Sequence, residues 1–193
     1  AGNQVAVGMY IYEASYVGVY PIVTGNTIYN ISADNTGDLA TIATGIMATN
    51  FDGIINGNRI YNIFNKSTGS TPETPPIAAG IFFRFTANPN AVINNMISIG
   101  SGQDDNVSYI GILSVISYDF NALNVYHNSV TISGNVTSGG LDSYCFRRGY
   151  SSIDSSVVIV DIKNNIFDNM RSGGTAKNYA IGTLFWSFNW NDE

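Results

Sequence analysis

Two adjacent carboxylates, Asp104 and Asp105 in the segment SGQDDN, come closest in this sequence to a pair that could do acid–base chemistry. Glycoside hydrolysis uses two carboxylates that face one site about 5–10 Å apart. Consecutive residues of a strand point to opposite faces, and in a turn such side chains are usually solvated. The pair therefore predicts a turn rather than a catalytic centre.

The chain holds one histidine, His127, and one cysteine, Cys145. A lone histidine cannot build a multi-histidine metal site, and no motif completes a catalytic triad around it. We expect a hydrogen-bonded imidazole in a turn. Cys145 lies in the apolar string YCF, which favours a buried packing residue, although Arg147 and Arg148 leave an activated thiolate open as the alternative. We therefore predict no catalytic residue.

One turn offers oxygen ligands for a hard cation. Asp34, Asn35 and Asp38 in the segment ADNTGD could contact Ca²⁺. The segment has neither the spacing of an EF-hand loop nor the glycine-rich nonapeptide of calcium-binding β-rolls. We expect an ordinary turn and no cofactor or metal, with Ca²⁺ kept as a weaker alternative.

Composition excludes several classes of partner. Charged residues make up 11 % of the 193 residues, and the formal net charge is −6. An acidic chain without a basic run is a poor partner for nucleic acid or for an anionic membrane. No apolar stretch reaches the roughly 18 residues of a membrane-spanning helix. We expect neither nucleic-acid binding nor membrane insertion.

The sequence that must position these residues repeats itself. The string GNTIYNI at 25–31 returns as GNRIYNI at 57–63, and its first asparagine recurs with an apolar residue three positions before it and another two after it. The recurring asparagines, spaced by 32, 37, 33 and 37 residues, are Asn26, Asn58, Asn95, Asn128 and Asn165. Internal periods of this length are typical of solenoids.

A second repeating element lies between the asparagines. The strings VGMYI, TGIMA, AGIFF and IGILS begin at Val7, Thr44, Ala79 and Ile110, and SYCFR and YAIGT continue them more weakly. Both elements are runs of Val, Ile, Tyr, Phe and Thr broken by turn formers, which indicates strands rather than helical repeats. Because one unit cannot bury its apolar face alone, we expect the units to stack as coils.

The recurring asparagine has a structural explanation. At a fixed corner of every coil, its amide can donate to one neighbouring coil and accept from the other, which forms a ladder along the axis. We predict such a ladder at Asn26, Asn58, Asn95, Asn128 and Asn165. The residue after it differs between Thr27 and Arg59, as expected for a position that points outward.

The pattern resembles the right-handed parallel β-helix of pectate-lyase-like proteins. The segments NALNVYHNSVTISG (121–134) and VDIKNNIFDNM (160–170) look similar to secreted repeat proteins of Bacteroidetes and their relatives. The resemblance implies an all-β solenoid of about five to six coils. It would form a single domain over residues 1–193, or a segment of a longer solenoid, secreted or on a bacterial cell surface.

Polysaccharide lyases and polygalacturonases share this fold, so the resemblance raises carbohydrate cleavage as an alternative function. Lyases of this kind use a basic residue beside acidic residues that hold calcium. Arg59 and Arg84 could share one outer face, but no acidic cluster accompanies them in the repeat strands. The polygalacturonase motifs Gly-His-Gly and Arg-Ile-Lys are absent. We expect solvated arginines and no enzyme.

Aromatic side chains form candidate outer rows. If Met9 and its counterparts face the core, the next residue of each copy points outward and gives a row of Tyr10, Met47, Phe82 and Leu113, continued by Phe146. Such rows could grip sugar rings or a neighbouring protein. Loops such as 66–76 could cover them instead, or the phase could be inverted. The candidate glycan- or partner-binding face is Tyr10, Tyr29, Tyr61, Phe82, Arg59 and Arg84.

Neither end of the repeat carries an amphipathic helix that would cover a terminal coil. Uncovered coils expose strand edges, which favours end-to-end self-association or continuation into neighbouring segments of a larger protein. Trp186 and Trp190 could plug the C-terminal end instead. The expected function is a non-enzymatic extracellular scaffold for adhesion or assembly, with polysaccharide binding or cleavage as the alternative.

Overall fold

The computed structural model describes residues 4–12, 20–35, 41–68, 75–84, 90–115, 122–149 and 159–183. Every regular element in these ranges is a β-strand. The strands are β1 (Gln4–Tyr12), β2 (Ile22–Thr24), β3 (Thr27–Ala33), β4 (Thr41–Thr49), β5 (Ile54–Asn56), β6 (Arg59–Asn65), β7 (Ile77–Arg84), β8 (Asn90–Ile93), β9 (Met96–Ile99), β10 (Ser108–Val115), β11 (Ala122–Tyr126), β12 (Ser129–Ile132), β13 (Asn135–Val136), β14 (Ser143–Arg148), β15 (Ile159–Lys163), β16 (Ile166–Asn169), β17 (Ser172–Gly173) and β18 (Asn178–Thr183).

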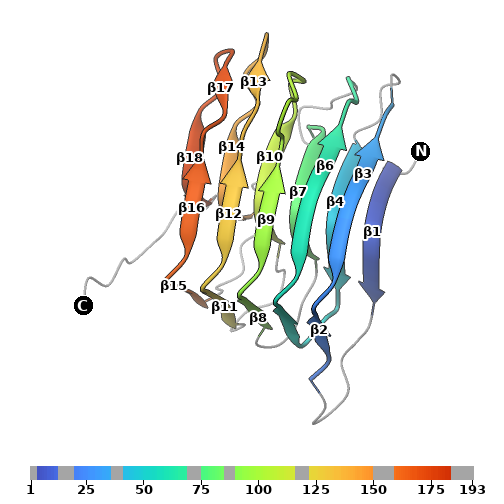
Figure 1. Ribbon diagram of the computed structural model, residues 1–193, viewed down its shortest axis with the longest axis vertical. Helices are drawn as coiled ribbons and strands as arrows, with labels where there is room; N and C mark the ends of the chain where they lie inside the picture. Colours follow the sequence, from blue (N-terminus) through green and yellow to red (C-terminus); the bar gives the residue numbers. More distant parts are fainter. Residues whose placement is uncertain are drawn as a thin grey trace.

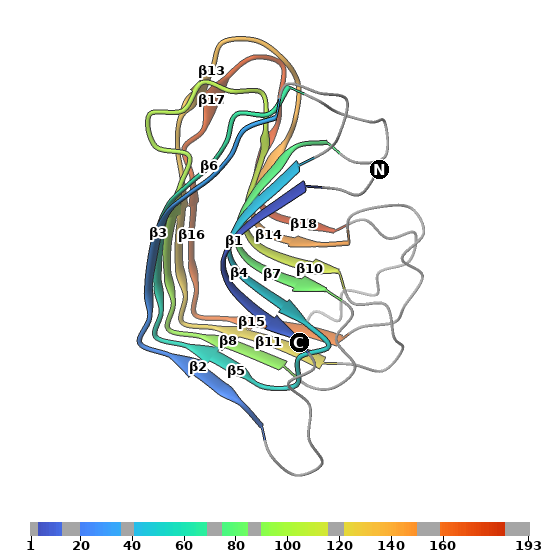
Figure 2. The same ribbon diagram turned by 90° about the vertical axis from the view of Figure 1, so that its right-hand side faces the viewer.

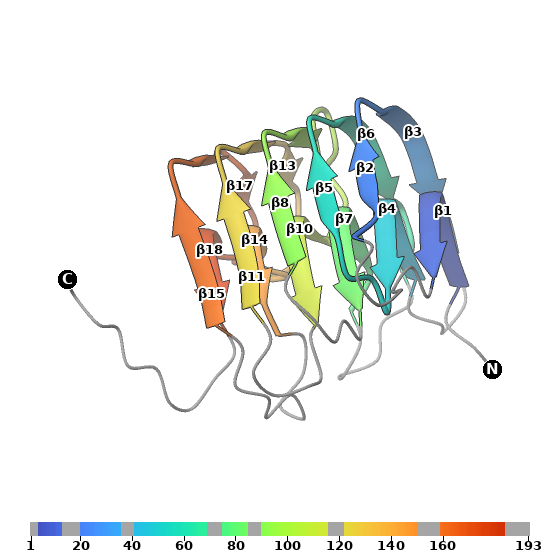
Figure 3. The ribbon, with the colours of Figure 1, turned by 90° about the horizontal axis from the view of Figure 1, so that it is seen from below.

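The strands form three parallel sheets that run along the stack (Figure 1, Figure 3). Sheet I has the order β1-β4-β7-β10-β14-β18, sheet II the order β2-β5-β8-β11-β15, and sheet III the order β3-β6-β9-β12-β16. A two-stranded sheet pairs β13 with β17. In Figure 2, sheets II and III meet at a corner and sheet I lies opposite them. The predicted all-β parallel β-helix class is confirmed, because each strand pairs with its counterpart one repeat away.

The number of turns is smaller than predicted. The described residues make about four turns, against the predicted five to six. The ladder asparagines Asn26 and Asn165 delimit four complete repeats. The prediction counted each copy of the sheet I strand as a coil, whereas β1 and β18 lie at the two ends of the stack, where the winding is incomplete.

Equivalent residues of successive coils lie side by side in rows. The inward row of sheet III is Ile28, Ile60, Ile97, Val130 and Phe167. The facing row of sheet I is Met9, Ile46, Ile81, Ile112, Phe146 and Ile181. The rows pack against each other as one apolar core. The expected outward position of Phe146 is wrong: it pairs with Ile112 and is 1 % exposed, because Cys145 occupies the glycine position of the repeat.

A row of glycines explains the second repeating element. Gly8, Gly45, Gly80 and Gly111 each lie where sheet I comes closest to sheet III. A Cβ on Gly80 would lie 2.5 Å from Ile97 Cγ2 and 2.6 Å from the carbonyl oxygen of Gly111. Neither distance is compatible with a side chain, so the close approach of the two sheets requires glycine here.

The corner between sheets II and III also has a fixed backbone geometry. The residue before each ladder asparagine has a positive φ between 55° and 70°: Gly25, Gly57, Asn94, His127 and Asn164. Glycine and asparagine adopt this left-handed conformation most readily. His127 is exposed and holds the same turn position, which accounts for its place in the sequence.

Candidate functional site

The asparagine ladder follows the corner between sheets II and III. Oδ1 of each asparagine after Asn26 accepts both the backbone N–H and the Nδ2 of the preceding asparagine at 2.8–3.0 Å. Nδ2 of Asn95 also donates to the carbonyl oxygen of Ile55 at 2.9 Å. Asn58, Asn95 and Asn128 are each 1 % exposed. Burial leaves no polar atom of these three amides unpaired, because the neighbouring coils supply every hydrogen-bond partner.

The two ends of this ladder differ in chemistry. All of its asparagine-to-asparagine bonds run one way, with the donor in the earlier coil and the acceptor in the later one. Within the described residues, Oδ1 of Asn26 therefore accepts no hydrogen bond, and the backbone N–H of Asn165 donates none. One end of the stack therefore offers an amide acceptor and the other an amide donor.

Large exposed apolar side chains gather on the two terminal coils. In the described part of the chain all of them except Met96 lie there: Val5, Tyr10, Tyr12, Tyr20, Ile22 and Tyr29 in the first coil, and Ile159, Ile166, Met170, Tyr179 and Ile181 in the last. The core rows are also only partly buried at these ends, at Val23 and Phe167 for example. Within the described ranges, both ends therefore expose a cross-section of the core together with the edges of three sheets.

Tyr29 and Tyr61 stack on the outer face of sheet III, with ring centroids 5.1 Å apart and an interplanar angle of 3°. The guanidinium carbon of Arg59 lies 5.2 Å from the centroid of the Tyr61 ring. Tyr29 is 51 % exposed and Tyr61 is half-buried. Three of the predicted face residues are thus adjacent, and they form a small aromatic surface with one positive charge.

The predicted binding face is wrong as a single surface. Tyr10, Phe82 and Arg84 belong to sheet I, which lies across the core from Arg59 in sheet III. Phe82 is only 5 % exposed, because it packs with other outward side chains of sheet I as a second apolar cluster: Met47, Ile77, Ala79, Ile110 and Leu113. Arg84 and Tyr10 are exposed, but on strands at different levels of the stack.

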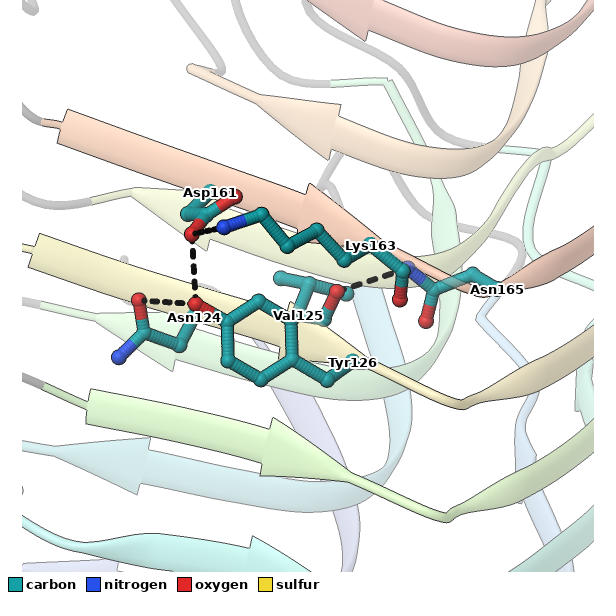
Figure 4. Close-up of polar contacts among 6 residues, drawn as sticks. All are labelled: Asn124, Val125, Tyr126, Asp161, Lys163 and Asn165. Carbon is teal, nitrogen blue, oxygen red and sulfur yellow. Dashed lines mark hydrogen bonds and ion pairs between the residues drawn. The ribbon is translucent and has the colours of Figure 1, made fainter.

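A polar cluster that the sequence analysis did not single out lies on sheet II (Figure 4). The Tyr126 hydroxyl donates to Oδ2 of Asp161 at 2.6 Å, and Nζ of Lys163 lies 2.7 Å from the same oxygen. The hydrogen bond from Lys163, and then that from Tyr126, lowers the pKa of Asp161, while the hydrogen bond to Asp161 raises the pKa of Tyr126. Each group keeps its ordinary charge at neutral pH, so the cluster joins β11 to β15 rather than holding a proton ready for transfer.

Strand β18 carries a pocket of about 310 Å³, lined by Tyr144, Arg147, Tyr179, Ile181, Gly182 and Thr183. The rings of Tyr144 and Tyr179 stack with centroids 5.2 Å apart, and the guanidinium carbon of Arg147 lies 4.7 Å from the centroid of Tyr144. Burial raises the pKa of Tyr144. This pocket could not be predicted from the sequence beyond the two weak copies of the sheet I string, because its walls come from residues about one repeat apart.

The carboxylate pair lies in the connection between β9 and β10, where Asp104 is exposed and Asp105 is half-buried. Burial and then the charge of Asp104 raise the pKa of Asp105. Arg171 is 4 % exposed and donates to the carbonyl oxygens of Asp105, at 2.6 Å, and of Val107. Arg171 thereby fastens this connection from a later coil.

The remaining chemical candidates are isolated. Cys145 is buried, and burial raises the pKa of its thiol to about 12, so it holds almost no thiolate at neutral pH. Asp38 lies outside the described residues, as do Trp186 and Trp190. Across the described ranges, no group of three or more His, Cys, Asp or Glu side chains could hold a metal ion. In the same ranges, no helix has the length and apolarity to span a membrane.

Comparison of the chain with known protein-family models, with curated proteins and with solved structures finds no match. Its function must therefore be argued from its own geometry.

Proposed function

We propose that this protein is a non-enzymatic building block of an extracellular or cell-surface assembly, and that its copies stack end to end. The observation that carries the proposal is the concentration of exposed apolar side chains on the two terminal coils. A coil in the middle of the stack buries its inward rows against both neighbours, whereas each terminal coil has a neighbour on one side only. A second copy would supply the missing neighbour.

The two ends meet through sheet I. If β18 of one copy continues into β1 of another with the internal register, Ile181 comes beside Met9, so the inward row of sheet I continues with an apolar residue. Sheet I has six strands and sheets II and III have five each, so the open edges of sheets II and III then face each other across the width of one further strand. Contacts of this head-to-tail kind do not close on themselves and produce filaments.

The test is the mass of the purified protein in solution as a function of concentration, by light scattering, with electron micrographs of the same samples. We expect mass to rise with concentration and linear particles to lengthen by about 29 Å per copy, because each copy adds the six strands of sheet I at about 4.8 Å each. A monomer at every concentration would overturn the proposal.

A matched pair of lysine variants tests whether the ends of the stack are responsible for the assembly. Phe167→Lys places a charge in the open core cross-section, where a monomer can hydrate it but a stack would bury it. Ser129→Lys adds the same charge to an outward position of an interior coil. We expect the first variant to stay monomeric with an unchanged circular dichroism spectrum, and the second to assemble like the parent protein.

The extracellular location belongs to this proposal. Its support is the resemblance of segments 121–134 and 160–170 to secreted surface repeat proteins of Bacteroidetes. A surface low in charge and rich in neutral amides also suits a passive scaffold whose solubility does not depend on ionic strength.

Glycan binding is a second candidate function, favoured by the Tyr29–Tyr61 stack with Arg59 beside it. Exposed aromatic rings pack against sugar rings, and a guanidinium binds carboxylate or sulfate substituents. A glycan array tests this directly. Binding of acidic glycans that is lost in Tyr61→Ala would support the candidate, and an array without signal would remove it.

A further inference from the structure

One outward row of sheet I lacks a side chain at a single position. The row runs through Tyr10, Met47, Phe82, Leu113, Arg147 and Gly182. It begins with a tyrosine that is 57 % exposed and ends with a glycine in the last strand, β18. The row therefore has a projecting side chain at one end of the stack and a gap at the other.

The pocket on β18 lies at this gap. The Tyr144 ring lies over Gly182, and a Cβ added to Gly182 would lie 2.3 Å from this ring. The pocket is lined by outward residues and also by Ile181, which belongs to the inward row. Among the described residues β18 is the last strand of sheet I, so the pocket lies beside the position that a further strand of this sheet would take. Its volume of about 310 Å³ is at the lower limit of small-molecule sites and suits a single ring.

The first strand of another copy would bring Tyr10 to this position. Continuing the internal register beyond β18 sets Val7 beside Tyr179, Met9 beside Ile181 and Tyr10 beside Gly182. Neighbouring strands lie about 4.8 Å apart, which is within reach of an aromatic side chain that leans across the strand edge. Tyr144 already leans across one strand in this way.

We infer that Tyr10 of one copy inserts into the pocket on β18 of the next copy, and that this contact sets the register and the direction of stacking. The inference rests on the end-to-end assembly proposed above and names its specific contact. The inserted ring packs beside Tyr144 and Tyr179, with the Arg147 guanidinium close to the same aromatic group. A slip of one residue would bring the inward side chain of Met9 or Ile11 to the outer face, so only one register fills the pocket.

Three variants test the contact by sedimentation equilibrium. Tyr10→Ala removes the ring, and we expect the association constant to fall at least tenfold. Tyr10→Phe keeps the ring and is expected to stay within about threefold of the parent. Met96→Ala, the matched control, removes an equally exposed apolar side chain from the interior strand β9 and should also stay within about threefold. Because Tyr10 is exposed in the monomer, its removal should leave the fold intact.

A complementation experiment tests the polarity. Gly182→Arg fills the pocket with the side chain that the preceding coil already carries at this position, Arg147. Each variant alone should fail to assemble, since Tyr10→Ala has an intact pocket without the ring and Gly182→Arg has the ring without a pocket. Mixed together, they share one intact interface per pair and should form dimers but no filaments.

The outcomes separate the two proposals. If the parent protein never assembles, the end-to-end function and this contact both fail. If the parent protein assembles and Tyr10→Ala assembles equally well, the stacking proposal stands and this contact is wrong. Equal loss in Tyr10→Ala and Met96→Ala would also overturn it, because the loss would then not depend on the end of the stack.

Discussion

Asn95 shows how a single residue type holds successive coils together. Its Oδ1 accepts from the backbone N–H and the Nδ2 of Asn58, and its Nδ2 donates to Oδ1 of Asn128 and to the carbonyl oxygen of Ile55. All of these groups are buried or nearly so. No water can replace a lost partner at this corner, so the ladder contributes mainly by avoiding unpaired buried groups.

We therefore expect Asn95→Ala to be costly. The change leaves the buried N–H of Asn58 without its acceptor and removes the amide donor to the carbonyl oxygen of Ile55, and an unpaired buried group costs about 1–3 kcal/mol. We predict a loss of about 2–4 kcal/mol in the free energy of unfolding, measured by urea denaturation of the monomer. Asn56→Ala is the control, because its Oδ1 accepts one exposed hydrogen bond, from Asn94, and its loss should cost less than about 0.5 kcal/mol. Equal effects of the two changes would contradict the role of the ladder.

At the scale of the strands, two glycine rows have different physical causes. Gly80 belongs to the row where sheet I approaches sheet III, and a side chain is excluded there because it has no room. Gly57 belongs to the row of turn residues before the ladder asparagines. There the space is open, and the positive φ is what restricts the residue type. Asparagine replaces glycine in the second row at Asn94 and Asn164, but no residue with a side chain occupies the first row before Cys145.

This difference predicts opposite outcomes for two substitutions. Gly80→Ala puts a Cβ against the Gly111 carbonyl oxygen, which is backbone and cannot turn away, and we expect a loss of about 1–3 kcal/mol. Gly57→Asn places a residue that tolerates the left-handed conformation into open space, and we expect a change below about 0.5 kcal/mol. Thermal melts of the two variants check this. A tolerated Gly80→Ala would show that the sheets can move apart without cost.

At the scale of the whole molecule, stability is divided among coils that contact only their neighbours. Solenoids of this kind behave as sums of repeat and interface terms. Removal of residues 59–95 joins Asn58 to Met96, which pairs with Arg59 and holds the same place in the repeat. The shortened chain keeps every row in register.

We predict that this deletion gives a folded protein with one coil fewer. Its circular dichroism should keep the β-sheet form, and its urea m-value should fall by about a fifth, because m follows the surface exposed on unfolding. Deletion of residues 59–96, one residue more, is the control. It places Ile97 at the outward position and inverts the following strand, so we expect it not to fold. If neither deletion folds, the coils are not interchangeable units.

The fold class and the ladder positions could be predicted from the sequence because they depend on periodicity. A residue such as Asn95 or Ile97 meets its own equivalent in the next coil, so a repeat of about 35 residues already specifies its neighbours. The turn before each ladder residue follows from local backbone preference, which also explains His127.

Contacts across the outer faces were decided only by the tertiary structure. Phe82 and Tyr10 share one row, yet Phe82 is buried and Tyr10 is exposed, because exposure depends on what packs over a strand and on its level in the stack. The pocket on β18 depends on how far the Tyr144 ring leans over Gly182. Repetition in a sequence determines which residues become neighbours along the axis, whereas side-chain packing across the faces and at the ends is not periodic and arises only when the chain is folded.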